Sequence, residues 1–303
     1  MNKFGIYIHI PYCIQRCSYC DFATYERSQI MHPSQYVDLI LKEIQLKHTF
    51  FSPQELTSIY FGGGTPSLIE PFLLKKIMDE VFSVGFTKNN KTEITIEINP
   101  ATLTDLSLEQ YLNAGFNRFS VGAQTFNDRH LKNLGREHNV EDTLQTLGLL
   151  KKYKTNFSLD LLFAIPHQTM TELKHDIDQA LDINPSHIST YCLTLQEGHP
   201  LNQNRPMDED QIEMFNEIHT NLSENSYSRY EISNYSLSEK ESQHNLLYWT
   251  DQEYWGVGLG AHSYAKPTPN GVRFWNDRGI KKYEDHINSL SNHAPLTSPL
   301  QLE

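Results

Sequence analysis

Three cysteines stand close together near the start of the chain, at positions 13, 17 and 20. Thiolates are soft ligands that suit iron–sulfur clusters and zinc. A ferredoxin-type cluster uses four protein thiolates, so a [4Fe–4S] cluster on Cys13, Cys17 and Cys20 would keep one iron open. An open iron can chelate the amine and carboxylate of a methionine moiety. The spacing therefore predicts a cluster site with room for an external ligand.

Two alternatives remain open for these cysteines. Zinc also binds Cys3His sets, and His9 lies nearby in the sequence, although it belongs to a predicted strand and need not converge. The other alternative is a chance group of thiols or a redox pair. The fourth cysteine, Cys192, falls in a predicted strand and is interpreted as a small buried hydrophobe.

A glycine-rich loop follows the second predicted strand, in the order Phe61-Gly62-Gly63-Gly64-Thr65-Pro66. Glycines permit very close approach of the backbone to a ligand, so the N–H and C=O groups of this loop can bond a polar head. A glycine triplet alone is only a turn, and that alternative stays open.

Four further polar residues are candidates, three of them in or just after predicted strands. Alternation puts Glu97 on the face opposite Ile96 and Ile98, where a buried carboxylate is costly unless it is paired. The alternative is a solvated acid at the end of the strand. Gln124 can bond ribose or carboxylate groups, and Arg136 can pair with a carboxylate through two bonds. Asp160 lies inside an apolar strand, where an isolated acid is expensive to bury.

Short β-rich runs alternate with amphipathic helical patterns through the first two-thirds of the chain. The predicted strands are Phe4–Ile10, Ser58–Phe61, Glu93–Ile98, Arg118–Gly122, Phe157–Leu162 and His187–Leu193. The predicted helices between them are Ser34–Phe50, with Ser34 as N-cap, Pro71–Phe82, Leu106–Asn113, Val140–Tyr153 and Met170–Asp182. This order predicts an α/β fold with a parallel sheet, and six units are too few for a closed eight-fold barrel. We therefore expect a partial (β/α)6 TIM-like barrel with ligands at the carboxyl ends of its strands.

The character of the sequence changes after about residue 200. We expect residues 1–200 to form the barrel and residues 201–303 to form a C-terminal extension with helices at Asp208–Leu222 and near Gly279–Leu290. The tail APLTSPLQLE has no clear structural destination.

The composition sets limits on function. The chain has 303 residues and a formal net charge of −12, which argues against broad nucleic-acid binding, since that binding relies on Lys and Arg. No apolar run approaches the roughly 18 residues of a membrane helix, and the N-terminus lacks the features of a secretory signal. We expect a cytoplasmic protein.

The cysteine motif, with Tyr19 before its last cysteine, resembles that of the radical SAM superfamily. The resemblance implies that the three thiolates hold a [4Fe–4S] cluster and that S-adenosyl-L-methionine (SAM) binds the open iron. It implies that the glycine loop binds the methionine amino group, that Glu97 bonds SAM, and that the backbone at Tyr19 contacts adenine. The positions that match SAM- or nucleoside-contacting positions are Tyr7, Gly63, Gly64, Thr65, Glu97, Gln124, Arg136 and Asp160. The resemblance includes two SAM-binding positions, so these residues need not all touch one molecule.

The glycine loop places the resemblance in one branch of the superfamily, and two further features narrow it within that branch. The GGGTP form of the loop resembles the branch of oxygen-independent coproporphyrinogen III dehydrogenase, but Phe22 stands where that enzyme has a further cysteine. The element from His244 to Trp249 (HNLLYW) resembles one associated with haem in the haem chaperones of this branch. Imidazole is a normal axial ligand of haem iron, and Tyr and Trp offer flat apolar surface for a porphyrin. The alternative for His244 is a packed core residue.

The resemblance therefore implies a chaperone that binds haem, the cluster and SAM and delivers haem to an apo-haemoprotein. An electron donor, a homodimer and peripheral contact with membrane haemoproteins are compatible with it. Such chaperones continue for several tens of residues, so we expect a shortened extension here. The rival hypotheses are a dehydrogenase-like radical SAM enzyme, for which no catalytic residue is assigned, and a zinc-binding structural protein.

Overall fold

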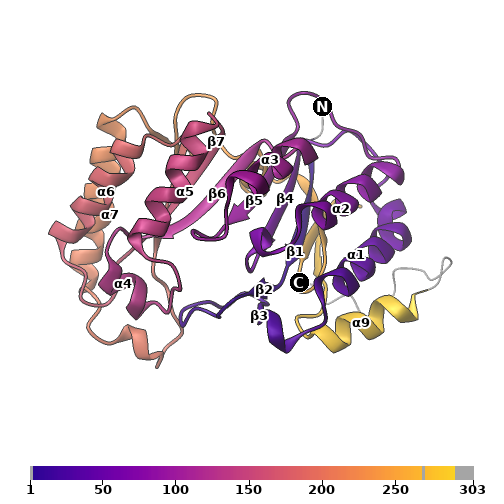
Figure 1. Cartoon of the computed structure of the whole chain (residues 1–303), viewed down its shortest axis with the longest axis horizontal. Coiled ribbons are helices and arrows are strands. Elements are labelled where there is room, and N and C mark those ends of the chain that lie inside the picture. Colours follow the sequence, from indigo (N-terminus) through magenta and orange to yellow (C-terminus); the bar gives the residue numbers. More distant parts are fainter. Residues whose placement is uncertain (1–2, 268–269, 291–303) are drawn as a thin grey trace.

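The computed structural model describes residues 3–267 and 270–290, so the predicted tail lies outside the described residues. Within that part of the chain, eleven strands form one sheet in the order β13-β12-β11-β1-β4-β5-β6-β7-β8-β10-β9. The consecutive parallel strands at its centre are β1 (Phe4–Ile10), β4 (Ser58–Gly63), β5 (Glu93–Ile98), β6 (Arg118–Gln124), β7 (Asn156–Phe163) and β8 (His187–Cys192). The predicted α/β fold and partial barrel are confirmed (Figure 1).

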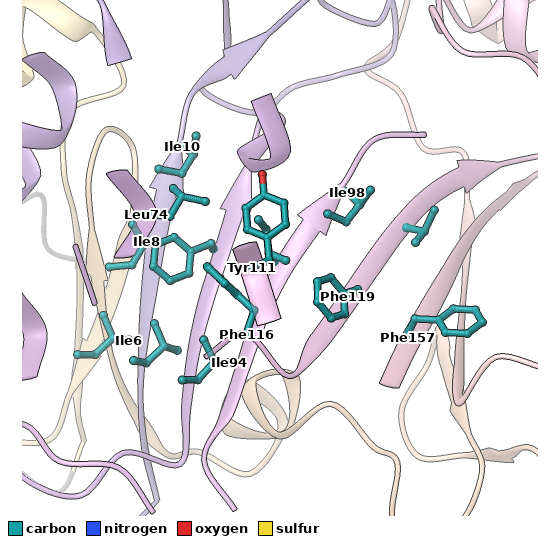
Figure 2. Close-up of a cluster of buried hydrophobic side chains, with 14 of the residues drawn as sticks. Ile6, Ile8, Ile10, Leu74, Ile94, Ile98, Tyr111, Phe116, Phe119 and Phe157 are labelled. Carbon is teal, nitrogen blue, oxygen red and sulfur yellow. The ribbon is translucent and has the colours of Figure 1, made fainter. Parts of the chain in front are cut away.

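Helices cover the outer face of these strands (Figure 1). They are α1 (Pro33–Lys47), α2 (Pro71–Ser83), α3 (Asp105–Ala114), α4 (Asp128–Asn133), α5 (Val140–Lys152) and α6 (Met170–Ile183). Every second strand residue points toward them, so Ile6, Ile94 and Phe119 pack in one continuous apolar core (Figure 2). Because one face of each strand packs in this core, the opposite face points into the barrel interior.

The inward face of the strands is polar. The register sets Tyr7 beside Tyr60, Tyr60 beside Thr95, and Thr95 beside Arg118. One layer further along, Glu97 lies beside Ser120 and Ser158 lies beside His187. The barrel interior is therefore lined with hydrogen-bonding groups rather than filled with aliphatic side chains.

Two local predictions need correction. Helix α1 begins at Pro33 and its N-cap is His32, whose side chain accepts a hydrogen bond from the backbone N–H of Ser34. Ser34 is not the N-cap because proline is well suited to the first helical position, so the N-cap lies two residues earlier than predicted. Strands β4 and β6 also run two residues further than predicted, into Gly63 and Gln124.

Residues after position 200 add to both edges of the same sheet. β11 (Glu253–Val257) pairs parallel with β1, and β12 (His262–Ala265) and β13 (Val272–Trp275) continue outward from it. On the other edge, β10 (Asn234–Ser236) and β9 (Ser228–Arg229) continue from β8. The helices of this part are α7 (Asp208–Glu224), α8 (Gln243–Trp249) and α9 (Ile280–Ser289), and α9 lies beside α1 in Figure 1. The boundary at residue 200 stays a prediction.

Among the described residues, no helix combines the length and the apolar character needed to cross a membrane.

Candidate functional site

A cavity of about 980 Å³ opens at the carboxyl ends of the strands and runs down into the barrel interior. Its volume lies near the top of the range of roughly 300–1,000 Å³ that is usual for small-molecule pockets. Every site residue predicted from the sequence lines it: Tyr7, Cys13, Cys17, Tyr19, Cys20, Gly63, Gly64, Thr65, Glu97, Gln124, Arg136, Asp160 and His244. The structure thus brings together residues from both ends of the chain.

The cysteine loop leaves β1 through the short strand β2 (Tyr12–Cys13), which pairs with β3 (Tyr25–Glu26). Its tip is tied to the loop that follows α4, because the backbone N–H and hydroxyl of Ser18 both donate to the carbonyl of Leu134, at 3.2 and 3.0 Å. These bonds carry Cys17 to Arg136, whose Nη1 lies 3.6 Å from the Cys17 Sγ.

The cysteine side chains form no disulfide. Burial, followed by the nearby Cys20 and Cys17 sulfurs, raises the pKa of the Cys13 thiol to about 11. The Cys20 Sγ lies 3.8 Å from the Thr24 hydroxyl. Soft donors that share one cavity, next to hydroxyl and guanidinium hydrogen-bond donors, fit the demands of an iron–sulfur cluster.

His9 does not complete a zinc site with them in this arrangement. Its Nε2 bonds the carbonyl oxygen of Ala23 at 2.9 Å and its Nδ1 bonds the hydroxyl of Tyr7 at 3.1 Å. Both ring nitrogens are engaged, so the Cys3His alternative lacks its histidine.

The glycine loop continues the sheet alongside the start of the cysteine loop. The N–H of Gly64 donates to the carbonyl of Ile10 at 2.8 Å, and the N–H of Thr65 donates to that of Tyr12 at 2.7 Å. Gly63 has φ +119°, and a Cβ there would lie 2.5 Å from the His9 ring. Glycine is therefore required for this backbone to lie against β1.

Glu97 lies at the centre of the cavity wall. Its carboxylate accepts hydrogen bonds from the Tyr60 hydroxyl and from the backbone N–H of Gly63, each at 2.9 Å. Burial raises the pKa of Glu97 to about 7, although both hydrogen bonds act against that rise. The carboxyl group is thus held in one orientation beside the glycine loop, ready to accept from a ligand.

Gln124 reaches the cavity through an irregularity in its strand. The pairing of β6 with β7 shifts register between Val121 and Gln124, and Gln124 has a positive φ of 68°. A positive φ is uncommon for a residue with a side chain, and such strain concentrates at functional sites. The Gln124 amide nitrogen and the Arg136 guanidinium both lie close to Gly122. Arg136 itself donates to Asn99 Oδ1 at 2.6 Å and to the Gly122 carbonyl at 2.9 Å.

Asp160 is buried among hydroxyl groups. It accepts from Ser189 at 2.7 Å and from Ser120 at 3.3 Å, and burial raises its pKa. The serines supply the partners that the apolar strand pattern did not reveal.

His244 lies at the opposite end of the barrel from the cysteines, beside the first residues of β1 and β4. Its ring is 2% exposed, with Nδ1 2.8 Å from the Ser58 hydroxyl and Nε2 2.9 Å from the Tyr248 hydroxyl. Burial lowers the pKa of His244 to about 3, so the ring is neutral. Both nitrogens have partners, and haem ligation by His244 stays a prediction.

The interpretation of Cys192 as a small buried hydrophobe is only partly right. Cys192 packs against the apolar core, but it is only partly buried and also lines the cavity. Its Sγ donates toward Gln211 Oε1 of α7 at 3.5 Å, so the thiol has a polar partner as well.

Sequence reasoning missed several polar cavity residues, among them Tyr60, Arg118 and His187. The available signal was the two-residue alternation of the strands, since Arg118 and His187 each begin a strand whose next residue is apolar.

Residues 7–180 match the sequence profile of the radical SAM superfamily, and the fold and cavity define a radical SAM protein. The chain is 38% identical over 261 residues to the heme chaperone HemW of Buchnera aphidicola subsp. Schizaphis graminum, covering 85% of this chain and 69% of that relative. It is 33% identical over 286 residues to heme chaperone HemW of Lactococcus lactis, covering 91% and 73%. Within the superfamily, the chain belongs to the heme chaperone HemW family.

A solved structure with the same fold is coproporphyrinogen III oxidase (HemN) from Escherichia coli, a radical SAM enzyme. The TM-score is 0.80 at 20% sequence identity, covering 95% of this chain and 69% of the enzyme. At this identity the likeness concerns the fold alone. Membership of the superfamily implies a [4Fe–4S] cluster and SAM.

Proposed function

We propose that this protein is a haem chaperone that binds haem, a [4Fe–4S] cluster and SAM and delivers haem to an apo-haemoprotein in the cytoplasm. The observation that carries the proposal is the similarity to proteins named heme chaperone HemW over most of the chain. Phe22 supports it, because this exposed side chain lines the cavity where the dehydrogenase of the branch has a further cysteine.

In this proposal Cys13, Cys17 and Cys20 hold the cluster, and the cluster offers an open iron to SAM. The backbone at Gly63 and Gly64 meets the methionine end of SAM, where Glu97 is oriented as an acceptor. The fixed positions of Gln124 and Arg136 add an amide and a guanidinium at the same rim. Tyr7, Tyr19, Thr65 and Asp160 complete the proposed SAM-contacting set.

The decisive experiment is haem transfer to an apo-haemoprotein, run with the reconstituted protein and with protein stripped of its cluster. We expect a haemoprotein spectrum to appear in the recipient at a rate above that of free haem. A rate equal to that of free haem with both preparations would contradict the chaperone function.

Addition of SAM and a strong reductant distinguishes the chaperone from the rival hypothesis, a dehydrogenase-like radical SAM enzyme. The chaperone hypothesis expects no multiple-turnover formation of 5′-deoxyadenosine and no decarboxylation of coproporphyrinogen. Sustained formation of both products would establish the enzyme instead.

Cluster binding is tested by anaerobic reconstitution. Wild type should take up about four irons and four sulfides per chain, and Cys17→Ala should lose most of both. Cys192→Ser is the matched control and should keep them. Bound zinc without sulfide would overturn the assignment of the cysteines.

Haem ligation by His244 has a specific structural requirement. The iron can reach a ring nitrogen only after Ser58 or Tyr248 has released it. We expect His244→Ala to change the absorption spectrum of bound haem and weaken binding. An unchanged spectrum and affinity would remove His244 as the ligand, and Ser58→Ala serves as a control that frees Nδ1 without removing the ring.

A further inference from the structure

The part of the cavity at the amino ends of the strands, lined by Arg118 and His187, is called the lower chamber here. It contains a buried guanidinium that makes no side-chain hydrogen bond with the described residues. Arg118 is 3% exposed and lines the cavity. Its ion-pair partner among the described residues is Glu93, with Oε2 3.7 Å from Arg118 Nε, which is beyond hydrogen-bond distance. A guanidinium carries five N–H donors, and burying it without acceptors is unfavourable.

The carboxylates around it are, by contrast, satisfied by other groups. Glu93 accepts from the Ser242 hydroxyl and from two backbone N–H groups at the start of α8, between 3.1 and 3.3 Å. Glu97 and Asp160 have the partners described above. The group that lacks a partner in the lower chamber is therefore the Arg118 donor, and a ligand that binds there must supply a hydrogen-bond acceptor.

His187 supplies a second polar group with the same demand. Its ring is 2% exposed, Nε2 lies 2.9 Å from the Tyr230 hydroxyl, and Nδ1 is buried without a partner. Burial, and then the Arg118 charge, hold the pKa of His187 well below its ordinary value, so the ring is neutral. When Tyr230 donates to Nε2, Nδ1 carries the proton and is a donor.

We propose that the lower chamber of this cavity binds a carboxylate group of a ligand, held by the Arg118 guanidinium and assisted by His187. Arginine is suited to this role because its planar fork matches a carboxylate through two parallel bonds. Two ligands of the proposed function carry carboxylates, a porphyrin through its propionates and SAM through its methionine end. The choice of haem and SAM as probes rests on the proposed chaperone function.

The experiment compares each ligand with a version whose carboxylate is blocked or absent. One arm titrates haem against haem dimethyl ester, and the other titrates SAM against decarboxylated SAM. For the ligand that occupies the site, wild type should bind the form with a free carboxylate about tenfold more tightly than the form without it. Arg118→Gln should reduce this ratio of affinities to near one. Arg129→Gln, on an exposed side chain paired with Glu172, is the matched control and should leave the ratio unchanged.

The structural alternative is that Arg118 serves only as the partner of Glu93. Glu93→Gln removes that charge while keeping an acceptor for α8, and we expect it to preserve the ligand ratio. If Arg118→Gln fails to fold, wild-type ratios near one in both arms still overturn the proposal, and a tenfold ratio in the haem arm still supports it, because only the carboxylate of SAM has the open iron as another partner. A ratio that persists in Arg118→Gln overturns it as well.

The two proposals fail in different ways. Failed haem transfer with an Arg118-dependent ratio in the SAM arm would remove the chaperone function and leave the carboxylate site. Successful haem transfer with affinity ratios near one in both arms would support the chaperone function and remove the carboxylate site.

Discussion

At the scale of single residues, Glu97 shows how the cavity holds a titratable group in place. Its two hydrogen bonds orient the carboxyl group, yet burial raises its pKa to about 7. The unfolded chain loses this proton near pH 4.3. Between these values Glu97 binds more protons in the folded state than in the unfolded state, so its contribution to stability falls as the pH rises through that window.

We therefore expect Glu97 to contribute a fall of roughly 1–3 kcal/mol in the free energy of unfolding of the ligand-free protein between pH 4.5 and 8, against the opposite contribution of the buried neutral His187 and His244. Glu97→Gln cannot lose a proton, so the difference in slope between wild type and this variant should equal the Glu97 contribution. Urea unfolding at a series of pH values measures it. The exposed Glu224→Gln is the matched control and should keep the wild-type slope, and an equal slope in Glu97→Gln would contradict the assignment.

At the scale of elements, one strand side chain holds a helix in place. Glu93 at the start of β5 accepts the N–H groups of Gln243 and His244, which open α8. Anionic groups are favourable at helix N-termini because the first N–H groups lack partners and the dipole is positive there. The helix that carries the HNLLYW element is thereby fixed to the barrel.

Glu93→Ala should destabilise the protein by about 3–5 kcal/mol, because it leaves Arg118 as an uncompensated buried charge and strips α8 of its acceptor. Chemical denaturation measures the loss. Glu93→Gln keeps the acceptor and should lose less. A Glu93→Ala variant as stable as wild type would show that α8 is held by its apolar contacts alone.

The elements could be predicted largely from the sequence, and their long-range partners could not. The strand–helix alternation and the site residues at strand ends could be predicted, because the spacing of apolar residues along the sequence indicates which residues are buried. The pairing of β11 with β1 joins Phe4 to Glu253, and no local pattern encodes such a contact. The unpartnered Nδ1 of His187 and the position of Arg118 in the cavity wall likewise depend on neighbours from several strands.

At the scale of the whole molecule, the residues after position 200 cover both edges of the central sheet. Glu43 of α1 strengthens the link on one side. Its buried carboxylate accepts from the Gly258 N–H and the Tyr283 hydroxyl, each at 2.8 Å, and from Asn276 Nδ2 at 2.7 Å. The segment after β11 and α9 are therefore anchored to the first helix of the chain.

A fragment of residues 1–200 should consequently fail to unfold cooperatively, because β1 and β8 would both become open edges and Glu43 would lose these partners. Near-ultraviolet circular dichroism and a thermal scan test this, with the 303-residue chain as the control. A sharp transition in the fragment would show that the barrel folds without the later residues.

The parallel pairing of β1 with β11 also has a consequence for synthesis on the ribosome. Phe4 and Glu253 are 253 − 4 = 249 residues apart in the chain. At translation rates of roughly 5–20 residues per second, β1 waits about 12–50 seconds for that partner. During this interval its free edge can pair with strands of other nascent chains. The cysteine loop that follows β1 emerges at the start of the same interval, so cluster insertion can precede completion of the sheet.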